Sequence, residues 1–273
     1  MRLQPDSADT LNNIGNVLFI LGKKEKVIAN YREAVRIRPN FAEAHNNLGV
    51  ALAEKGQYEE AIEHYVISLH LDPDFVDAHS NYGIALRLSG KSAKAIQQFA
   101  EVLKRNPTHR VAHANLGIIY SQQGNLANAR KHFESVALSN PDDPDAQCNL
   151  GIVLARLGKP MAAVPYFEAA VRLKPEHAAA RVNLSDMLNL LGTEALLASD
   201  LPTAQIRFAN AVTANPANST AQHNLGVVLW RQGTPKAALP HFEMAVKLKP
   251  DFPAAANALR ELRLQLARAT DKR

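Results

Sequence analysis

Histidine is the residue of this sequence best suited to hold a metal ion or transfer a proton, and one pair has helical spacing. His109 and His113 lie four residues apart, which would place both imidazoles on one face of a helix. A zinc site needs three or four protein ligands, and no third ligand lies near this pair in the sequence. We therefore expect neither a metal site nor a cofactor.

Two other features invite a chemical interpretation. The motif Ser-Gly-Lys-Ser at 89–92 resembles the end of a phosphate-binding loop, but Ala85 stands where that loop requires glycine, and no strand precedes it. Cys148 is the only cysteine, so it has no partner for an intrachain disulfide, and nothing near it indicates a reactive thiol. The sequence thus predicts no catalytic residues, and we expect that the chain is not an enzyme.

Asparagine offers a different chemistry, because it recurs at a nearly constant interval. The interval is 34 residues, except for a last one of 41, in the series Asn13, Asn47, Asn81, Asn115, Asn149, Asn183 and Asn224. An exposed primary amide has an acceptor and two donor hydrogens, so it can pair with the backbone of an extended peptide. Amides stepping roughly 10 Å would meet such a peptide about every third residue. We predict a peptide-binding asparagine ladder; the alternative is that these amides form local hydrogen bonds within the fold.

Proline marks the elements that must position these asparagines. The same interval, again with one step of 41, separates Pro5, Pro39, Pro73, Pro107, Pro141, Pro175, Pro216 and Pro250. A helix rarely continues through proline, so each proline indicates the end of a repeat. With this proline at position 32, the seven repeats span 8–41, 42–75, 76–109, 110–143, 144–177, 178–218 and 219–252.

Glycine and aromatic residues predict two packed helices in each repeat. Glycine at position 8, replaced only by Ser185, implies that a neighbouring helix approaches the backbone closely there. A second glycine, at or near position 15, suits a left-handed end to the first helix. This second set is Gly22, Gly56, Gly90, Gly124, Gly158, Gly192 and Gly233. The rings at position 24, which we assign to the core, are Tyr31, Tyr65, Phe99, Phe133, Phe167, Phe208 and Phe242.

This pattern resembles the tetratricopeptide repeat (TPR) family over essentially the whole chain. Repeat 2 carries the family motif as Leu48-Gly49, then Ala61 and Tyr65, then Pro73. The chain departs from the motif at position 4, where His45, His79 and His113 replace a large aromatic residue; we interpret them as packing substitutes. The resemblance implies an all-α, right-handed superhelical solenoid of seven TPR hairpins plus a C-terminal capping helix, with the first helices lining a concave groove.

The ends of the chain and the long interval need separate interpretation. Residues 1–7 align with the end of a preceding repeat, and 253–270 read as a capping helix with leucines on one side. An uncapped first repeat would expose an apolar edge, which favours self-association. The sixth repeat carries seven extra residues near 193–199, interpreted either as a projecting element for a partner or as a tolerated insertion at a hairpin tip.

Charge and hydropathy narrow the partners. The chain has a net charge of +5, yet the positions that the family fold directs into the groove hold six acidic and three basic residues. Nucleic-acid binding in the groove is therefore disfavoured, and a neutral or mildly basic peptide suits it better. No apolar run approaches 18 residues, so no membrane insertion is predicted, and we expect a cytoplasmic or otherwise soluble chain, or a soluble domain of a longer protein.

Two large aromatic residues at position 12, Phe19 and Trp230, would anchor a ligand at the ends of the groove if they are exposed. The alternative for Trp230 is packing against the terminal helix.

The function predicted from the sequence is a protein-interaction module that holds an extended segment. The asparagine run also resembles the superhelical TPR domain of the O-linked N-acetylglucosamine transferase, which implies that the asparagines grip a peptide backbone. Two alternatives remain open: an assembly scaffold that self-associates through its N-terminal edge, and a substrate-recruiting accessory domain of a larger enzyme such as a glycosyltransferase.

Overall fold

The computed structural model describes residues 7–270, which form helices joined by short turns and contain no strand. The described residues hold fifteen helices, which are α1 (Ala8–Ile20), α2 (Lys24–Ile37), α3 (Ala42–Glu54), α4 (Tyr58–Leu71), α5 (Val76–Leu88), α6 (Ser92–Arg105), α7 (Arg110–Gln122), α8 (Leu126–Ser139), α9 (Pro144–Arg156), α10 (Pro160–Leu173), α11 (Ala178–Leu197), α12 (Leu201–Ala214), α13 (Ser219–Arg231), α14 (Pro235–Leu248) and α15 (Pro253–Thr270). The all-α fold of seven helical hairpins and a terminal helix, predicted from the sequence, is confirmed.

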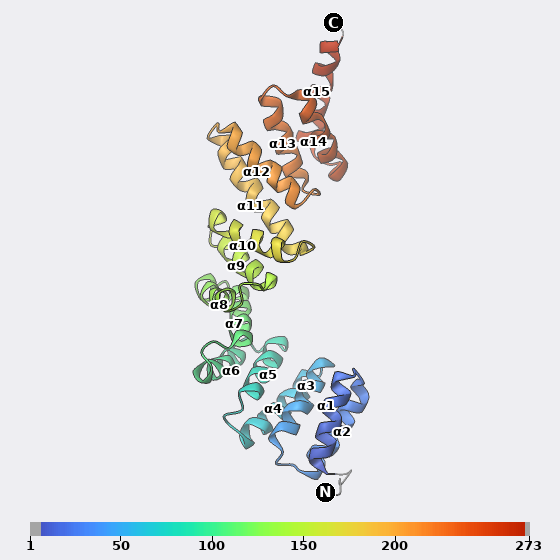
Figure 1. Ribbon diagram of the computed structural model, residues 1–273, viewed down its shortest axis with the longest axis vertical. Helices are drawn as coiled ribbons and strands as arrows, with labels where there is room; N and C mark the ends of the chain where they lie inside the picture. Colours follow the sequence, from blue (N-terminus) through green and yellow to red (C-terminus); the bar gives the residue numbers. More distant parts are fainter. Residues whose placement is uncertain (1–6, 271–273) are drawn as a thin grey trace. The chain divides into compact units, whose positions relative to one another are not determined.

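Each hairpin pairs a first helix with the second helix that follows it, and successive hairpins pack on one another within a compact unit (Figure 1). The chain divides into two such units, one ending at Ser139 and the other beginning at Asn140. Hairpins 1 to 4 (α1 to α8) make up the first unit; hairpins 5 to 7 and α15 make up the second. No helix of the described residues is both long enough and apolar enough to cross a bilayer.

The core of each hairpin is a ring of the second helix lying against a glycine of the first. In hairpin 2, Tyr65 is buried beside Gly49, and a Cβ added to that glycine would lie only 2.6 Å from Tyr65 Cε1. Any larger residue at this site would have to displace the ring, because real side chains do not approach so closely. The predicted close approach at position 8 is therefore confirmed.

The turn inside each hairpin closes in the same way. Gly56 has φ +78°, its N–H donates to Ala53 O, and the N–H of Gln57 donates to Leu52 O at 3.0 Å. These two bonds form a Schellman motif, which satisfies carbonyl groups at the end of α3 and needs a left-handed residue. The predicted role of the second glycine is confirmed here.

The prediction for Gly192 is wrong. This glycine lies inside α11, is buried, and faces the Phe208 ring, to which an added Cβ would come within 2.7 Å. The left-handed residue of hairpin 6 is Ser199, with φ 63°, and the N–H of Asp200 donates to Ala195 O at 2.9 Å. Seven residues make about two helical turns, so Gly192 repeats the face of Ser185 and occupies the position 8 role seven residues late.

The extra seven residues of the sixth repeat lengthen a helix. Helix α11 has 20 residues, whereas the first helices of the other hairpins have 13, and all the second helices have 14.

The two ends of the described chain are built differently. The expected end of a preceding repeat, residues 1–7, lies outside the described residues except for Ser7, whose Oγ accepts a hydrogen bond from the Thr10 N–H and caps α1. At the other end, α15 packs on α14 with Leu262 fully buried and with Leu259 and Leu266 partly buried.

Candidate functional site

The seven ladder asparagines all lie on first helices, as their interval requires. Asn13 is exposed and Asn115 is buried, while the other five side chains are half-buried. The members Asn13, Asn47, Asn81 and Asn115 belong to the first unit, and Asn149, Asn183 and Asn224 belong to the second. The predicted ladder is therefore divided between the two units.

Five of these amides make hydrogen bonds inside the fold. Three donate from Nδ2 to the Oδ1 of an asparagine on the preceding first helix: Asn47 to Asn12 at 3.0 Å, Asn81 to Asn46 at 3.0 Å, and Asn224 to Asn189 at 2.9 Å. The other two donate to the carbonyl four residues earlier in their own helix, Asn115 to Val111 and Asn183 to Ala179, both at 2.8 Å. Local hydrogen bonding is therefore one role of this series.

The partners Asn12, Asn46 and Asn189 were missed in the sequence. The signal was available in the first two cases, since Asn12-Asn13 and Asn46-Asn47 are asparagine pairs. Asn189 was hidden because it takes up this role only after the two extra turns of α11.

An open pocket of about 340 Å³ lies between α1 and α3. It is lined by Asn16, Phe19, Ile20, Tyr31, Glu43, Asn47 and Val50, so it includes one ladder asparagine and one predicted anchor. The Tyr31 hydroxyl donates to Asn16 Oδ1 at 2.7 Å, and Asn47 Nδ2 also donates to that oxygen at 3.2 Å. Burial, together with the nearby Glu43 carboxylate, raises the pKa of Tyr31 to about 12, so the phenol stays neutral.

The same arrangement recurs one hairpin further along. A second open pocket of about 220 Å³, between α3 and α5, is lined by Val50, Ala53, Glu54, Tyr65, Asn81, Ile84 and Leu88. Val50 belongs to both pockets, which therefore adjoin. Each has a position 24 tyrosine and a ladder asparagine in its lining, so the pockets repeat with the hairpins.

A third open pocket, of about 600 Å³, adjoins the first at Glu43 and Asn47. It lies over the starts of α3 and α5 and is lined by Phe41, Ala42, Glu43, Asn46, Asn47, Asp72, Phe75 and Asp77. We call the three adjoining pockets the groove; it belongs entirely to the first unit. Its charged lining residues, Glu43, Glu54, Asp72 and Asp77, are all acidic.

Arg87 marks the end of the groove beyond Leu88. Its Nε donates to Asn115 Oδ1 at 2.7 Å, so Arg87 already bonds the oxygen that the next ladder asparagine would offer to a ligand. Burial lowers the pKa of the half-buried guanidinium.

The two predicted anchors lie in different surroundings. Phe19 is half-buried and lines the first pocket. Trp230 packs against the terminal helix, as its alternative interpretation expects: its Nε1 donates to Gln265 Oε1 at 2.7 Å, and its ring meets Phe242 edge-on.

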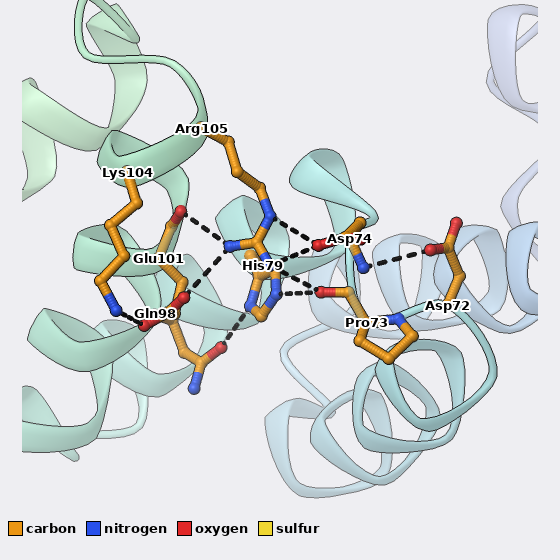
Figure 2. Close-up of polar contacts among 8 residues, drawn as sticks. All are labelled: Asp72, Pro73, Asp74, His79, Gln98, Glu101, Lys104 and Arg105. Carbon is orange, nitrogen blue, oxygen red and sulfur yellow. Dashed lines mark hydrogen bonds and ion pairs between the residues drawn. The ribbon is translucent and has the colours of Figure 1, made fainter.

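The position 4 residues tie successive hairpins together. His79 Nε2 donates to Pro73 O at 3.0 Å, and its Nδ1 lies 2.8 Å from Gln98 Oε1 on the second helix of its own hairpin (Figure 2). Arg105 reaches the same proline carbonyl and also pairs with Asp74. In other hairpins the position 4 residue bonds the carbonyl of the equivalent proline, the one just before its own hairpin. These residues are His45, His113, Gln147 and Gln222. A hydrogen bond to the preceding turn thus replaces the packing of the large aromatic residue in the family motif.

In two hairpins the position 4 histidine also pairs with a histidine of the second helix. His45 and His64 approach to 3.0 Å between Nδ1 atoms, and His113 and His132 to 2.9 Å. One nitrogen of each pair must accept, so at least one imidazole of the pair is neutral. Burial, and then the neighbouring His113, lower the pKa of His132 to about 4; burial and His45 lower that of His64.

The remaining chemical candidates have structural roles. His109 caps α7 by accepting from the Ala112 N–H, and His113 bonds the Pro107 carbonyl. Cys148 is buried, and burial, aided by Asp145, raises the pKa of its thiol to about 11. Across residues 7–270, no group of three or more histidine, cysteine or carboxylate side chains could hold a metal ion.

Comparison with known proteins identifies the repeat. A model described as TPR repeat matches residues 15–56, and models described as tetratricopeptide repeat match 42–75, 86–150, 148–196 and 189–253. No curated protein matches the chain.

Solved structures share the fold at low sequence identity. The C-terminal part of a TPR repeat-containing protein from Cytophaga hutchinsonii has a TM-score of 0.67 and 17% identity, covering 90% of this chain and 98% of its own. YrrB, described as a TPR protein with an unusual peptide-binding site, has a TM-score of 0.57 and 22% identity, covering 73% and 99%. MamA from Desulfovibrio magneticus RS-1, from residue 41 to its end, has a TM-score of 0.58 and 22% identity, covering 63% and 97%.

The family matches follow one another along most of the chain, and they agree with the hairpins, the position 8 glycines and the rings packed on them. The chain belongs to the tetratricopeptide repeat family and has the fold of a protein-interaction module.

Proposed function

We propose that the first unit binds an extended segment of another protein along the groove. The observation that carries the proposal is the repetition of pockets: two similar apolar pockets adjoin at Val50, one hairpin apart, and each borders a ladder asparagine. Hairpins step by roughly 10 Å and an extended chain rises about 3.3 Å per residue, so side chains about three residues apart would enter successive pockets.

The ladder asparagines then contribute unequally. Asn81 uses one amide hydrogen on Asn46, and among the described residues no donor reaches its Oδ1, so it retains an acceptor and a donor for a peptide backbone. Both amide hydrogens of Asn47 are directed at Asn12 and Asn16. We therefore assign the backbone grip in the groove mainly to Asn81, and we assign the side-chain grip to the pockets.

The test is to fill the groove without unfolding it. Val50 is half-buried and shared by both apolar pockets, so Val50→Trp should block both. We expect the wild-type chain to capture peptides from a random library and the variant to lose them. Val66→Trp is the matched control, because Val66 is an exposed valine on α4, outside the groove lining. Unchanged capture by Val50→Trp, with an unaltered circular dichroism melt, would refute binding in the groove.

A second candidate function is self-association, and the edge of hairpin 1 favours it. Ile14 is 41% exposed at position 7, where Leu48 and Leu116 are 0% and 3% exposed in hairpins 2 and 4. Val17, on the same helix, is 56% exposed, and Leu21, which directly follows that helix, is 62% exposed. Light scattering over a range of concentrations should show a dimer that Ile14→Glu abolishes; a monomer at every concentration would count against this function.

A further inference from the structure

We infer that the segment bound in the groove is basic, with a lysine or arginine that reaches the third pocket beside apolar side chains in the first two. This inference rests on the proposed function and names the chemistry of its partner. It is the opposite of what the basic composition of the whole chain would favour.

The charged residues that line the groove all have the same sign. Across the three pockets, the lining holds four carboxylates, from Glu43, Glu54, Asp72 and Asp77, and no lysine or arginine. The neighbouring Lys55 is directed to Glu25 at 3.3 Å, and Arg38 to Asp9, so these nearby cations already have acidic partners. Because a chain of net charge +5 places only acidic groups here, the groove complements a positive ligand.

This charge is concentrated in the third pocket. The third pocket gathers Glu43, Asp72 and Asp77 together with the rings of Phe41 and Phe75. Carboxylates beside aromatic faces suit a guanidinium or ammonium group, which gains both ion pairing and cation–π contact. Arg38 already lies over the Phe41 ring, 4.6 Å from its centroid, which shows that a cation can approach this ring.

The charges at the two ends of the groove also favour one direction of the bound ligand. The opposite end of the groove stops at Arg87, whose half-buried cation is bonded to Asn115 and pairs with no carboxylate of the described chain. A basic residue there would meet like charge. The basic end of the ligand should therefore lie over the starts of α3 and α5, with its apolar residues extending toward Leu88.

The experiment compares defined probes by fluorescence anisotropy. The first probe is a short labelled peptide with two lysines followed by two leucines three positions apart. In the second probe glutamates replace the lysines, and in the third the leucines are adjacent. We expect the wild-type chain to bind the first probe about tenfold more tightly than the second, with a smaller margin in high salt. The third probe should also bind more weakly, since adjacent side chains lie only about 3.3 Å apart along an extended peptide, too close to enter two pockets that step by roughly 10 Å.

A variant that neutralises two carboxylates tests whether the basic residue of the ligand binds in the third pocket. Asp72→Asn with Asp77→Asn removes two carboxylates from the third pocket and keeps an acceptor for the Asp74 N–H, which Asp72 Oδ1 binds at 3.1 Å. This variant should lose most of the lysine preference. Glu168→Gln with Asp251→Asn is the matched control, because it changes the net charge equally through exposed residues of the second unit.

The outcomes separate the two proposals. Equal binding of lysine and glutamate probes, or equal losses in the groove variant and its control, would overturn the basic-ligand inference while leaving peptide binding intact. Absence of binding by all three probes, together with no capture from the random library, would overturn the proposed function and this inference with it. Preference for lysine that only the groove variant loses supports both.

Discussion

The hairpin of α3 and α4 and the hairpin of α11 and α12 differ in the length of the first helix, 13 residues against 20. Both place a glycine against a buried ring 16 residues later, Gly49 against Tyr65 and Gly192 against Phe208. Both also have a left-handed residue seven positions after that glycine, Gly56 in one and Ser199 in the other. The hairpin tip is therefore the constant part, and the first helix can begin earlier without disturbing it.

The difference also reaches the neighbouring hairpins. Asn47 and Asn224 both donate to an asparagine 35 residues earlier, but the acceptor is at position 5 in hairpin 1 and at position 12 in hairpin 6. The start of α11 keeps the ordinary numbering, with Asn183 at position 6, while its end follows a numbering shifted by seven. This one helix therefore carries two registers.

The largest effect is expected from removal of the buried ring of either hairpin. Phe208→Ala and Tyr65→Ala should each lower the free energy of unfolding by about 3–5 kcal/mol, because each ring is buried and its removal leaves a cavity. Urea denaturation followed by circular dichroism measures this. A much smaller loss for Phe208→Ala would mean that hairpin 6 packs less tightly than hairpin 2.

The next effect tests the register of α11. Gly192→Ala and Gly49→Ala should each cost about 1–2 kcal/mol, since the added methyl group overpacks the ring by more than alanine gains in helix propensity. Glu194→Ala, at an exposed position of the same helix, is the control. If Gly192→Ala were as harmless as the control, Gly192 would not face Phe208 in solution.

A smaller effect tests the turn. Ser199→Gly should stabilise the protein by about 1 kcal/mol, because a left-handed conformation is strained for serine and free for glycine. The reciprocal change Gly56→Ser should destabilise hairpin 2 by a similar amount. Thermal melts of both variants measure the pair, and shifts of the same sign would contradict the shared turn geometry.

The smallest effect concerns pH. Hairpin 2 is joined by the His45–His64 pair, whereas in hairpin 6 the position 4 residue is Arg181, which donates to Ala214 O at 2.8 Å. The pKa of His64 is lowered in the folded state. Its contribution to the free energy of unfolding is therefore complete above the ordinary histidine pKa of about 6.5 and is lost as the pH falls below that value.

Replacing His64 with glutamine, the residue that hairpin 3 has at this place in Gln98, should reduce the loss of the denaturation midpoint on acidification. His70→Gln, an exposed histidine on the same helix, is the control. Identical pH profiles for wild type and His64→Gln would contradict this role. Part of the dependence should survive in any case, because the pKa of His132 is lowered to about 4.

The repeats, the seven hairpins and the ring-on-glycine core could be predicted because each depends on spacing within one repeat. Gly49 and Tyr65 are fixed relative to one another by a helix, a turn and a second helix, whose lengths the sequence states directly. Gly192 could not be assigned in this way, because a shift of seven residues returns a helix to nearly the same face and both registers fit the pattern.

The polar contacts were harder to predict for a different reason. The sequence indicated that position 4 histidines replace an aromatic residue, but not that they bond the proline carbonyl of the preceding turn, since that depends on how hairpins stack. The role of Asn81 as a donor to Asn46 likewise depends on the approach of α3 and α5. The pockets of the groove follow from the same stacking, so only one of the predicted anchors, Phe19, lies in their lining.

The two registers of α11 separate the asparagines of the second unit along the helix. Seven extra residues advance the helix by about 10 Å along its own axis. The asparagine row that includes Asn183 is therefore displaced lengthwise from the contact between Asn189 and Asn224. An extended chain would need about three further residues to bridge that offset. Helix α11 thus sets a lengthwise offset between the asparagine near its start and the asparagine contact near its end.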